Sequence, residues 1–158
     1  MQHDVLGIYL NDHVAGATLG VGLARHVAHR HRRSVRGPLL ARIADEITQD
    51  RQALFMIMDG LGVPAHRYKV CAGWAAERVR RLKPNGFLQR HSGLDTVMEL
   101  ETLRLGVEGK SLLWHTLLAL APKRTSLDTA QLNDLLNRAR TQLDAVEDLR
   151  RTAAAAVL

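Results

Sequence analysis

The sequence of 158 residues contains a single cysteine, Cys71, so it cannot form an internal disulfide. One free cysteine is typical of a protein kept in a reducing compartment, and we therefore expect a cytoplasmic location. Aromatic residues make up only 4% of the chain, whereas apolar residues of all kinds make up 46%. A core built mainly from Leu, Val, Ile and Ala favours helices over sheets.

Long hydrophobic runs are also missing. The longest stretch without a charged residue or histidine, Val14–Ala24, is too short to cross a membrane, so we expect no membrane association. The first residues, MQHDVLGIYLND, carry an acidic residue where a signal peptide has basic ones, and we expect no such peptide. No phosphate-binding loop, dinucleotide fingerprint or hydrolase nucleophile motif is present. The net charge of +6 attracts anionic partners without specifying one.

Apolar residues recur at helical spacing in four long segments, which are residues 4–33, 38–61, 92–120 and 126–156. Ser126 is expected to cap the last of them. Short connections, SVRGP and PKRTS, join the first helix to the second and the third to the fourth, so each pair should be antiparallel. The connection between the pairs, about residues 62–92, is long and is expected to contain a short basic helix near residues 69–82.

This order of elements predicts an all-α fold with a single domain over residues 1–158. The domain would be a four-helix bundle of two antiparallel hairpins joined by a long crossover. An up-down bundle with an enlarged middle loop is the alternative.

Charged residues interrupt the apolar stripe of the third predicted helix. On a helical wheel, the inner face carries leucines together with Glu101, Arg104, Glu108 and His115. The opposite face, which is expected to face water, carries Asp95, Glu99, Thr102, Gly106 and Lys110. Inward charges must be paired, because a lone buried charge is unfavourable. The sequence therefore predicts a buried polar network that either fixes helix register or forms a site. Its predicted members are His13, Asp50, Arg51, Glu101, Arg104, Glu108 and His115.

This pattern resembles the ferritin-like superfamily over nearly the whole chain, at the level of architecture. In its di-iron members, two helices each supply a Glu and the other two each supply Glu-x-x-His. No Glu-x-x-His occurs here, since EITQ, ETLR and EDLR place Gln49, Arg104 and Arg150 where the motif has histidine. Arginine is permanently cationic, so it can replace the charge of a metal ion. The resemblance thus implies degenerate metal positions and no cofactor. The alternative is a metal site drawn from His13, Glu46, Asp50, Glu101, Glu108 and His115.

Two weaker features bear on binding. The glycines inside the predicted first and third helices are unfavourable there, and they are Gly16, Gly20, Gly22, Gly106 and Gly109. Gly16 and Gly20 lie on the inner side one turn apart, so the glycines indicate either close helix approach or room for a ligand. The basic tract HVAHRHRR, residues 26–33, is expected to be an exposed helix end that could bind nucleic acid weakly and without sequence preference.

The sequence assigns no reaction and no substrate. The leading hypothesis is a non-catalytic bundle that binds a small ligand or another protein, with a homodimer among the expected partners. A metal-dependent oxidoreductase or iron-handling bundle is the second hypothesis. A basic bundle associated with nucleic acid is the third.

Overall fold

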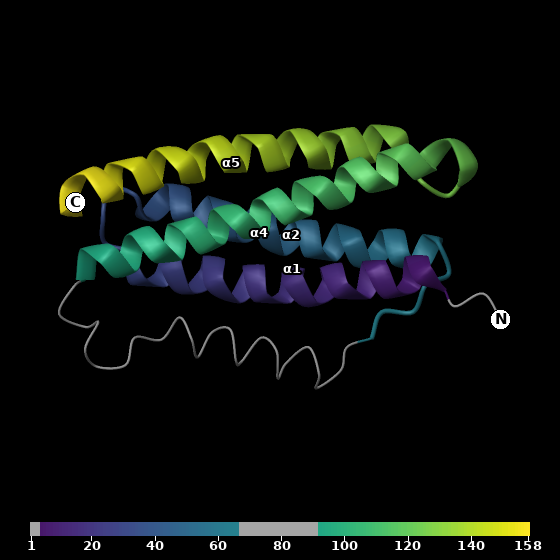
Figure 1. Cartoon of the computed structure of the whole chain (residues 1–158), viewed down its shortest axis with the longest axis horizontal. Helices are drawn as coiled ribbons and strands as arrows, with labels where there is room; N and C mark the ends of the chain where they lie inside the picture. The colour runs from purple at the N-terminus through teal and green to yellow at the C-terminus, as the bar shows by residue number, and fades with distance from the viewer. Residues whose placement is uncertain (1–3, 67–91) are drawn as a thin grey trace.

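The computed structural model describes residues 4–66 and 92–158 of the chain (Figure 1). These residues form four α-helices and one short 3₁₀ helix, with no strand among them, so the predicted all-α class is confirmed. The elements are α1 (Val5–Arg30), α2 (Gly37–Gly60), α4 (Ser92–Leu120), η2 (Ala121–Lys123) and α5 (Thr129–Val157). The basic helix expected at residues 69–82, and the crossover that would contain it, lie outside the described residues.

The start of α5 differs from the prediction. Asp128, and not Ser126, caps this helix, because its side chain accepts hydrogen bonds from the backbone N–H groups of Ala130 and Gln131 at 2.9 and 3.3 Å. The physical reason is the burial of Leu127, which is 7% exposed and packs into the core. The chain turns into the helix only after this residue, and an acidic cap suits the positive end of the helix dipole.

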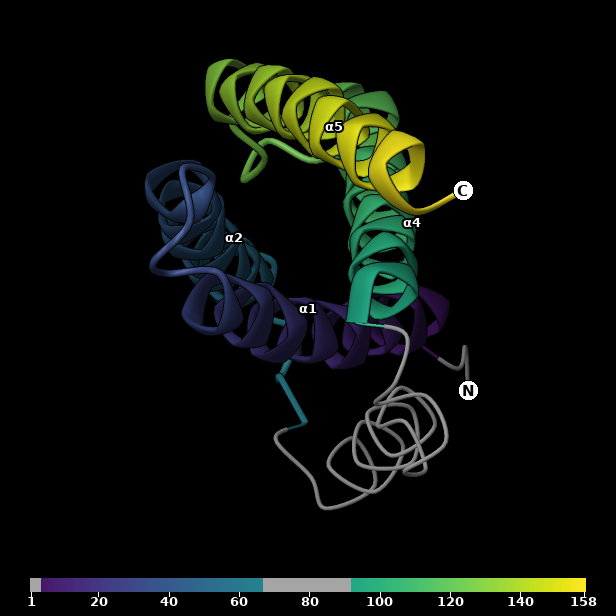
Figure 2. The same ribbon diagram turned by 90° about the vertical axis from the view of Figure 1, so that its left-hand side faces the viewer.

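The helices form two hairpins. The α1 and α2 helices pack along each other, as do α4 and α5, and α1 also contacts α4. In Figure 1, α2 and α4 run in the same direction, whereas α1 and α5 run the opposite way. The end of α2 and the start of α4 therefore lie at opposite ends of the bundle. Figure 2 looks along the helices and shows all four arranged around a common interior.

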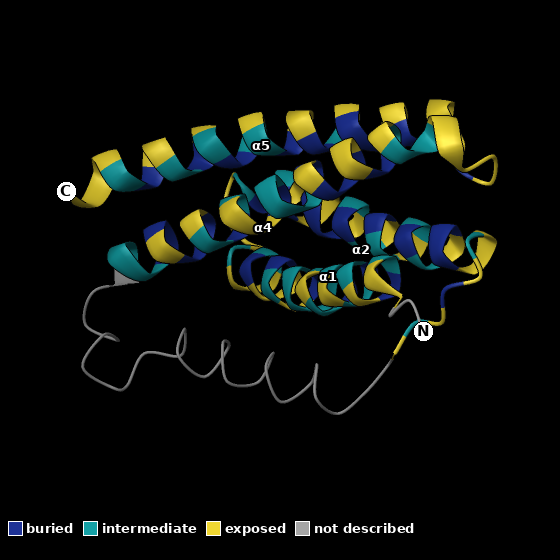
Figure 3. Cartoon of the chain, turned by 45° about the vertical axis from the view of Figure 1, so that its right-hand side comes forward, coloured by how far each residue is buried: buried dark blue, intermediate teal, exposed yellow. Residues whose placement is uncertain are grey.

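Buried residues face this interior on every helix (Figure 3). The largest fully buried side chains include Trp114 and Leu117 of α4, Leu10 of α1, Met58 of α2 and Leu132 of α5. The core is thus mainly aliphatic, as the composition predicts. Within residues 4–66 and 92–158, no helix combines the length and apolar character that a membrane span requires.

Candidate functional site

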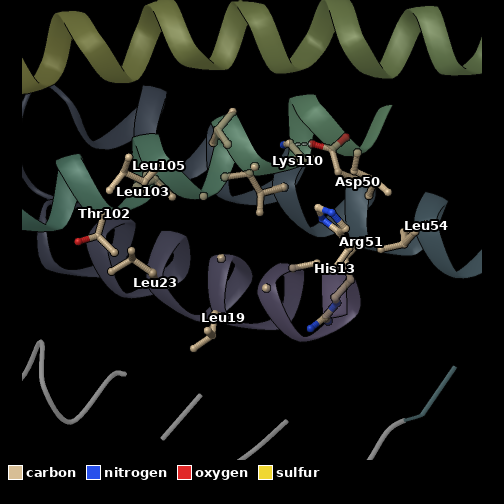
Figure 4. A pocket seen from close by; sticks show the side chains of 18 of the residues that line it. His13, Leu19, Leu23, Asp50, Arg51, Leu54, Thr102, Leu103, Leu105 and Lys110 are labelled. Carbon is tan, nitrogen blue, oxygen red and sulfur yellow. Dashed lines mark hydrogen bonds and ion pairs between the residues drawn. The ribbon is translucent and has the colours of Figure 1, made fainter. Parts of the chain in front are cut away.

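A cavity of about 420 Å³ lies between α1, α2 and α4. Its apolar walls include Leu19 and Leu23 from α1 and Leu103 and Leu105 from α4. The Leu105 side chain is 69% exposed, so the cavity opens to solvent along its rim. In Figure 4, Leu23, Leu103 and Leu105 lie toward one end of the cavity, while the charged residues Asp50, Arg51 and Lys110 lie toward the other, together with His13 and Leu54. The labelled charged residues are therefore concentrated at one end of a largely apolar cavity.

Four glycines line the same cavity, two from α1 and two from α4. A Cβ atom added at Gly16, Gly106 or Gly109 would meet no atom of the described residues within 4 Å. At Gly20 the nearest atom would be Ile47 Cγ2, at an ordinary contact distance of 4.0 Å. Among the described residues, nothing lies close enough to Gly16, Gly106 or Gly109 to require a glycine there, so close helix approach does not explain these three positions. Gly20 packs near α2 at an ordinary distance, and all four glycines line the cavity.

The polar end of the cavity is built on Asp50 of α2, which is 1% exposed. Its carboxylate binds Lys110 Nζ of α4 and the guanidinium of Arg138 of α5, whose Nε lies 2.8 Å from Asp50 Oδ1. Lys110 Nζ also donates to Gln142 Oε1 at 2.5 Å, and Gln142 Nε2 donates to Glu46 Oε2 at 3.0 Å. These contacts join α2, α4 and α5, with two cations on the Asp50 carboxylate and the Gln142 amide between Lys110 and Glu46.

Burial alters the protonation of two groups here. It lowers the pKa of Lys110, although the neighbouring carboxylate of Asp50 opposes the shift. It also lowers the pKa of His13, against the weaker opposing effect of Asp12. At neutral pH the imidazole of His13 is therefore neutral, with one hydrogen-bond donor and one acceptor. This ring packs edge-on against Tyr9, with ring centres 4.7 Å apart.

The structure brings only part of the predicted polar network together. Asp50 is buried as predicted, and His13 and Arg51 line the cavity beside it. The inward orientation predicted for Glu101 and His115 is wrong, because the side chain of Glu101 is 52% exposed and His115 is exposed as well. Both lie on the outer face of α4.

The role predicted for Arg104 is also wrong. Its Nε lies 3.2 Å from Glu147 Oε2 of α5, and its side chain is 39% exposed. Arg150 contacts the same Glu147 at 2.8 Å and Glu101 at 3.4 Å, so these charges pair along the outside of the α4–α5 hairpin. Glu108 is partly buried and forms no ion pair with a described residue. Arg104 therefore does not neutralise Glu101 and Glu108 inside the bundle.

These errors share one cause, a wrong rotation of α4 about its axis. Apolar residues lie on both sides of this helix, since Met98, Leu105 and Leu112 are exposed while Leu103 is buried. The pattern therefore offers two apolar faces, and the prediction selected the outer one. Trp114, the largest side chain of the helix and 1% exposed, was the signal that marks the inner face.

The correct rotation assigns inner positions to two residues expected to face water. Lys110, whose side chain is 13% exposed, reaches Asp50. Glu99 is 7% exposed and accepts a hydrogen bond from Arg30 Nη1 at 2.6 Å, which joins α4 to the end of α1. Arg138 and Gln142 of α5 were not predicted as partners of Asp50. Gln142 had a signal in the sequence, because it interrupts the apolar stripe of that helix.

The residues proposed as alternative metal ligands do not converge. Across residues 4–66 and 92–158, no group of three or more His, Cys, Asp and Glu side chains has the arrangement that holds a metal ion. Asp50 points inward, whereas Glu101 and His115 are exposed on α4. The ammonium group of Lys110 occupies the position beside Asp50 that a cation would need.

Comparison of the chain with protein-family models, with curated proteins and with solved structures finds no match. Its function must therefore be argued from the chemistry of the site, because even a known fold does not by itself imply a function.

Proposed function

We propose that this chain is a non-catalytic, ferritin-like helical bundle that binds a small, mainly apolar ligand in the cavity between α1, α2 and α4. The four glycines that line this cavity carry the proposal. Each is less favourable than alanine in a helix interior by about 0.5–1 kcal/mol, so together they cost roughly 2–4 kcal/mol. That cost is a substantial part of the usual stability of a domain, about 5–15 kcal/mol.

The two ordinary reasons for a glycine do not apply at these positions. None of the four has a positive φ, since Gly62 is the only glycine with that backbone conformation in the part of the chain that the structure describes. None has a close neighbour among the described residues that would exclude a Cβ. What they share is the cavity, so we infer that they keep its walls thin and its space open for a ligand.

The ferritin-like part of the proposal rests on the directions of the helices and on the charges. Two antiparallel hairpins with α2 and α4 running the same way are what a single long crossover produces. Inside the bundle, Lys110 Nζ contacts Asp50 and Gln142, and Gln142 in turn donates a hydrogen bond to Glu46. We propose that these contacts replace a di-metal site, because a fixed ammonium group balances carboxylate charge and repels a metal ion.

Filling the cavity tests the proposal. Gly16→Leu and Gly106→Leu each place an isobutyl group in the cavity. Gly22→Leu is the matched control, because Gly22 is in α1, is exposed, has no described neighbour within 4 Å of an added Cβ, and does not line the cavity. All three changes raise helix propensity in the same way.

The probe is the neutral apolar dye N-phenyl-1-naphthylamine, titrated by fluorescence at constant protein concentration. The wild type and the Gly22→Leu variant should bind the dye equally. The two cavity variants should bind it at least about tenfold more weakly, a loss of roughly 1.4 kcal/mol. Equal binding by all four proteins, or no binding by the wild type, would refute a ligand site at the glycines.

A further inference from the structure

His13 of α1 carries two ring nitrogens, and neither forms a hydrogen bond with a described residue. The residue lines the cavity and is only partly buried. Among the described residues, the buried polar side-chain atoms that lack a hydrogen-bond partner belong to His31, Glu99, Arg104 and Trp114. The unpaired nitrogens of His13 are not among these buried atoms, so they keep an accessible surface.

The position of His13 on α1 places its ring beside the open space over a glycine. Gly16 follows His13 by one turn, and residues at that spacing lie next to each other on one face of a helix. Both residues line the cavity, and a Cβ atom at Gly16 would meet no described atom within 4 Å. Figure 4 shows His13 toward the charged end, with Asp50 and Lys110. A ligand that lies over Gly16 therefore has the His13 ring within reach.

Tyr9 fixes the position of the His13 ring. The two rings pack edge-on, with their centres 4.7 Å apart and their planes at 66°. Tyr9 Oη in turn donates a hydrogen bond to Thr116 Oγ1 of α4 at 3.1 Å, so the contact is anchored on the opposite wall of the bundle. A ring that is already held in place loses less conformational freedom when a ligand binds.

The charged groups at this end of the cavity offer a ligand donors and no open acceptor. Lys110 and Arg51 can only donate hydrogen bonds. Both carboxylate oxygens of Asp50 already accept hydrogen bonds from described residues of α5. The imidazole of His13 is neutral at neutral pH, since burial lowers its pKa, and a neutral ring keeps one acceptor nitrogen. His13 therefore supplies an acceptor that a hydroxyl group of a ligand can use.

The charges that line the cavity balance. Asp12 and Asp50 are acidic, and Arg51 and Lys110 are basic, so their formal charges cancel. An ion would disturb this balance and would lose its hydration on entering, whereas a neutral molecule would do neither. The lining therefore favours an uncharged ligand.

We infer that the ligand of this cavity is a neutral alcohol or phenol, whose hydroxyl group donates a hydrogen bond to the unprotonated ring nitrogen of His13 while its apolar part lies over the glycines. This inference rests on the proposed function and adds the chemical class of the ligand. A hydrocarbon would leave the acceptor nitrogen unused, and an ether or a ketone could only accept. A carboxylate would bring a charge that the lining does not balance.

Three probes of similar shape test the inference in the wild-type chain at neutral pH. They are 2-phenylethanol, its methyl ether, which accepts hydrogen bonds but cannot donate one, and phenylacetate, which is charged. Affinity is measured by titration of the backbone amide signals of Gly16 and Gly106 in nuclear magnetic resonance spectra. The alcohol should bind about 3- to 10-fold more tightly than the ether, the range of one ordinary hydrogen bond. Phenylacetate should bind more weakly than the alcohol.

Two variants separate the hydrogen bond from the shape of the ring. His13→Phe keeps the aromatic contact with Tyr9 and removes both nitrogens, so it should bind the alcohol and the ether equally. His13→Gln restores an acceptor and should recover part of the preference for the alcohol. In the wild type this preference should also disappear well below the usual imidazole pKa of 6.5, because a protonated ring has two donors and no acceptor. The His13→Phe variant should show no such dependence on pH.

The remaining outcomes distinguish this inference from the proposed function. Equal binding of the alcohol and the ether by the wild type would overturn the inference and leave a ligand site at the glycines. Tighter binding of phenylacetate than of the alcohol would overturn the neutral class. A preference for the alcohol that persists in His13→Phe would overturn the role of His13, and the wild-type comparison decides if that variant does not fold. If no probe shifts the glycine signals, or if Gly16→Leu binds the probes as tightly as the wild type, the proposed function itself fails.

Discussion

Replacing Asp50 with asparagine should destabilise the bundle by about 3–5 kcal/mol, the usual cost of removing one partner from a buried ion pair. Asp50 is 1% exposed and binds both Lys110 and Arg138. Arg138 is 30% exposed and can turn to solvent, whereas the side chain of Lys110 is 13% exposed and would stay buried without its main counter-ion. For a domain of this size, the loss corresponds to a decrease in melting temperature of roughly 6–20 °C.

Urea denaturation followed by circular dichroism measures the change. Asp45→Asn is the control, because Asp45 lies on the same helix and is exposed, so its replacement should change stability by less than about 0.5 kcal/mol. A double change of Asp50→Leu and Lys110→Met should recover much of the stability, since it removes both buried charges together.

The loss should depend on pH through Lys110. Burial already lowers the pKa of this residue below its usual 10.5, and without Asp50 it should fall further. Between the lowered pKa in the folded protein and 10.5, the unfolded chain binds more protons than the folded one, so stability rises with pH. This pH window is wider in the Asp50→Asn variant. The difference in unfolding free energy between the variant and the wild type should therefore shrink as pH increases from 7 toward 10. A deficit equal to that of the control, or one that grows with pH, would refute this account of the buried pair.

Five further outcomes are expected from the structure and the sequence. Arg104→Ala should cost less than about 1 kcal/mol, and less still at high salt, because this arginine pairs with an acidic residue on the partly exposed α4–α5 surface; thermal melts at two salt concentrations check this. Gly16→Ala and Gly106→Ala should each stabilise by about 0.5–1 kcal/mol in urea titrations, because their Cβ atoms meet open space. Gly37→Ala should instead destabilise by about 1–3 kcal/mol in the same assay, because its Cβ would lie 2.7 and 2.9 Å from carbonyl oxygens of the preceding turn. Elemental analysis of untagged protein should find less than one tightly bound transition metal per chain, and stoichiometric iron or manganese would contradict the proposed loss of the metal site. DNA binding through residues 26–33 should show no sequence preference and should weaken steeply with salt in fluorescence anisotropy.

The helices were predictable because their signals are local. The low content of aromatic residues indicated helices, and the helical spacing of apolar residues showed where they run. Together with the breaks SVRGP and PKRTS, this spacing predicted the ends of all four described helices to within three residues. The burial of Asp50 was predictable for the same reason, since it lies between Ile47 and Leu54 in the apolar stripe of α2.

The role of the cavity glycines was only partly predictable from the sequence. Their unfavourable placement inside helices was visible in the sequence, but it fitted close helix approach as well as room for a ligand. The choice between close packing and open space depends on how far apart α1 and α4 lie around Gly16 and Gly106. That separation depends on all the side chains between the helices, and no local pattern contains it.

The sequence by itself determined the fold class, the extents of the helices and the presence of inward charges, because each follows from residues within a few turns of one another. Only the tertiary structure decided the rotation of α4, and with it the pairing of Asp50 with Lys110, the exposure of Glu101 and His115, and the open cavity. A helix with leucines on opposite faces has two rotations of similar local energy. Packing against three other helices selects between them, because only one rotation buries Trp114 and gives Lys110 a counter-ion.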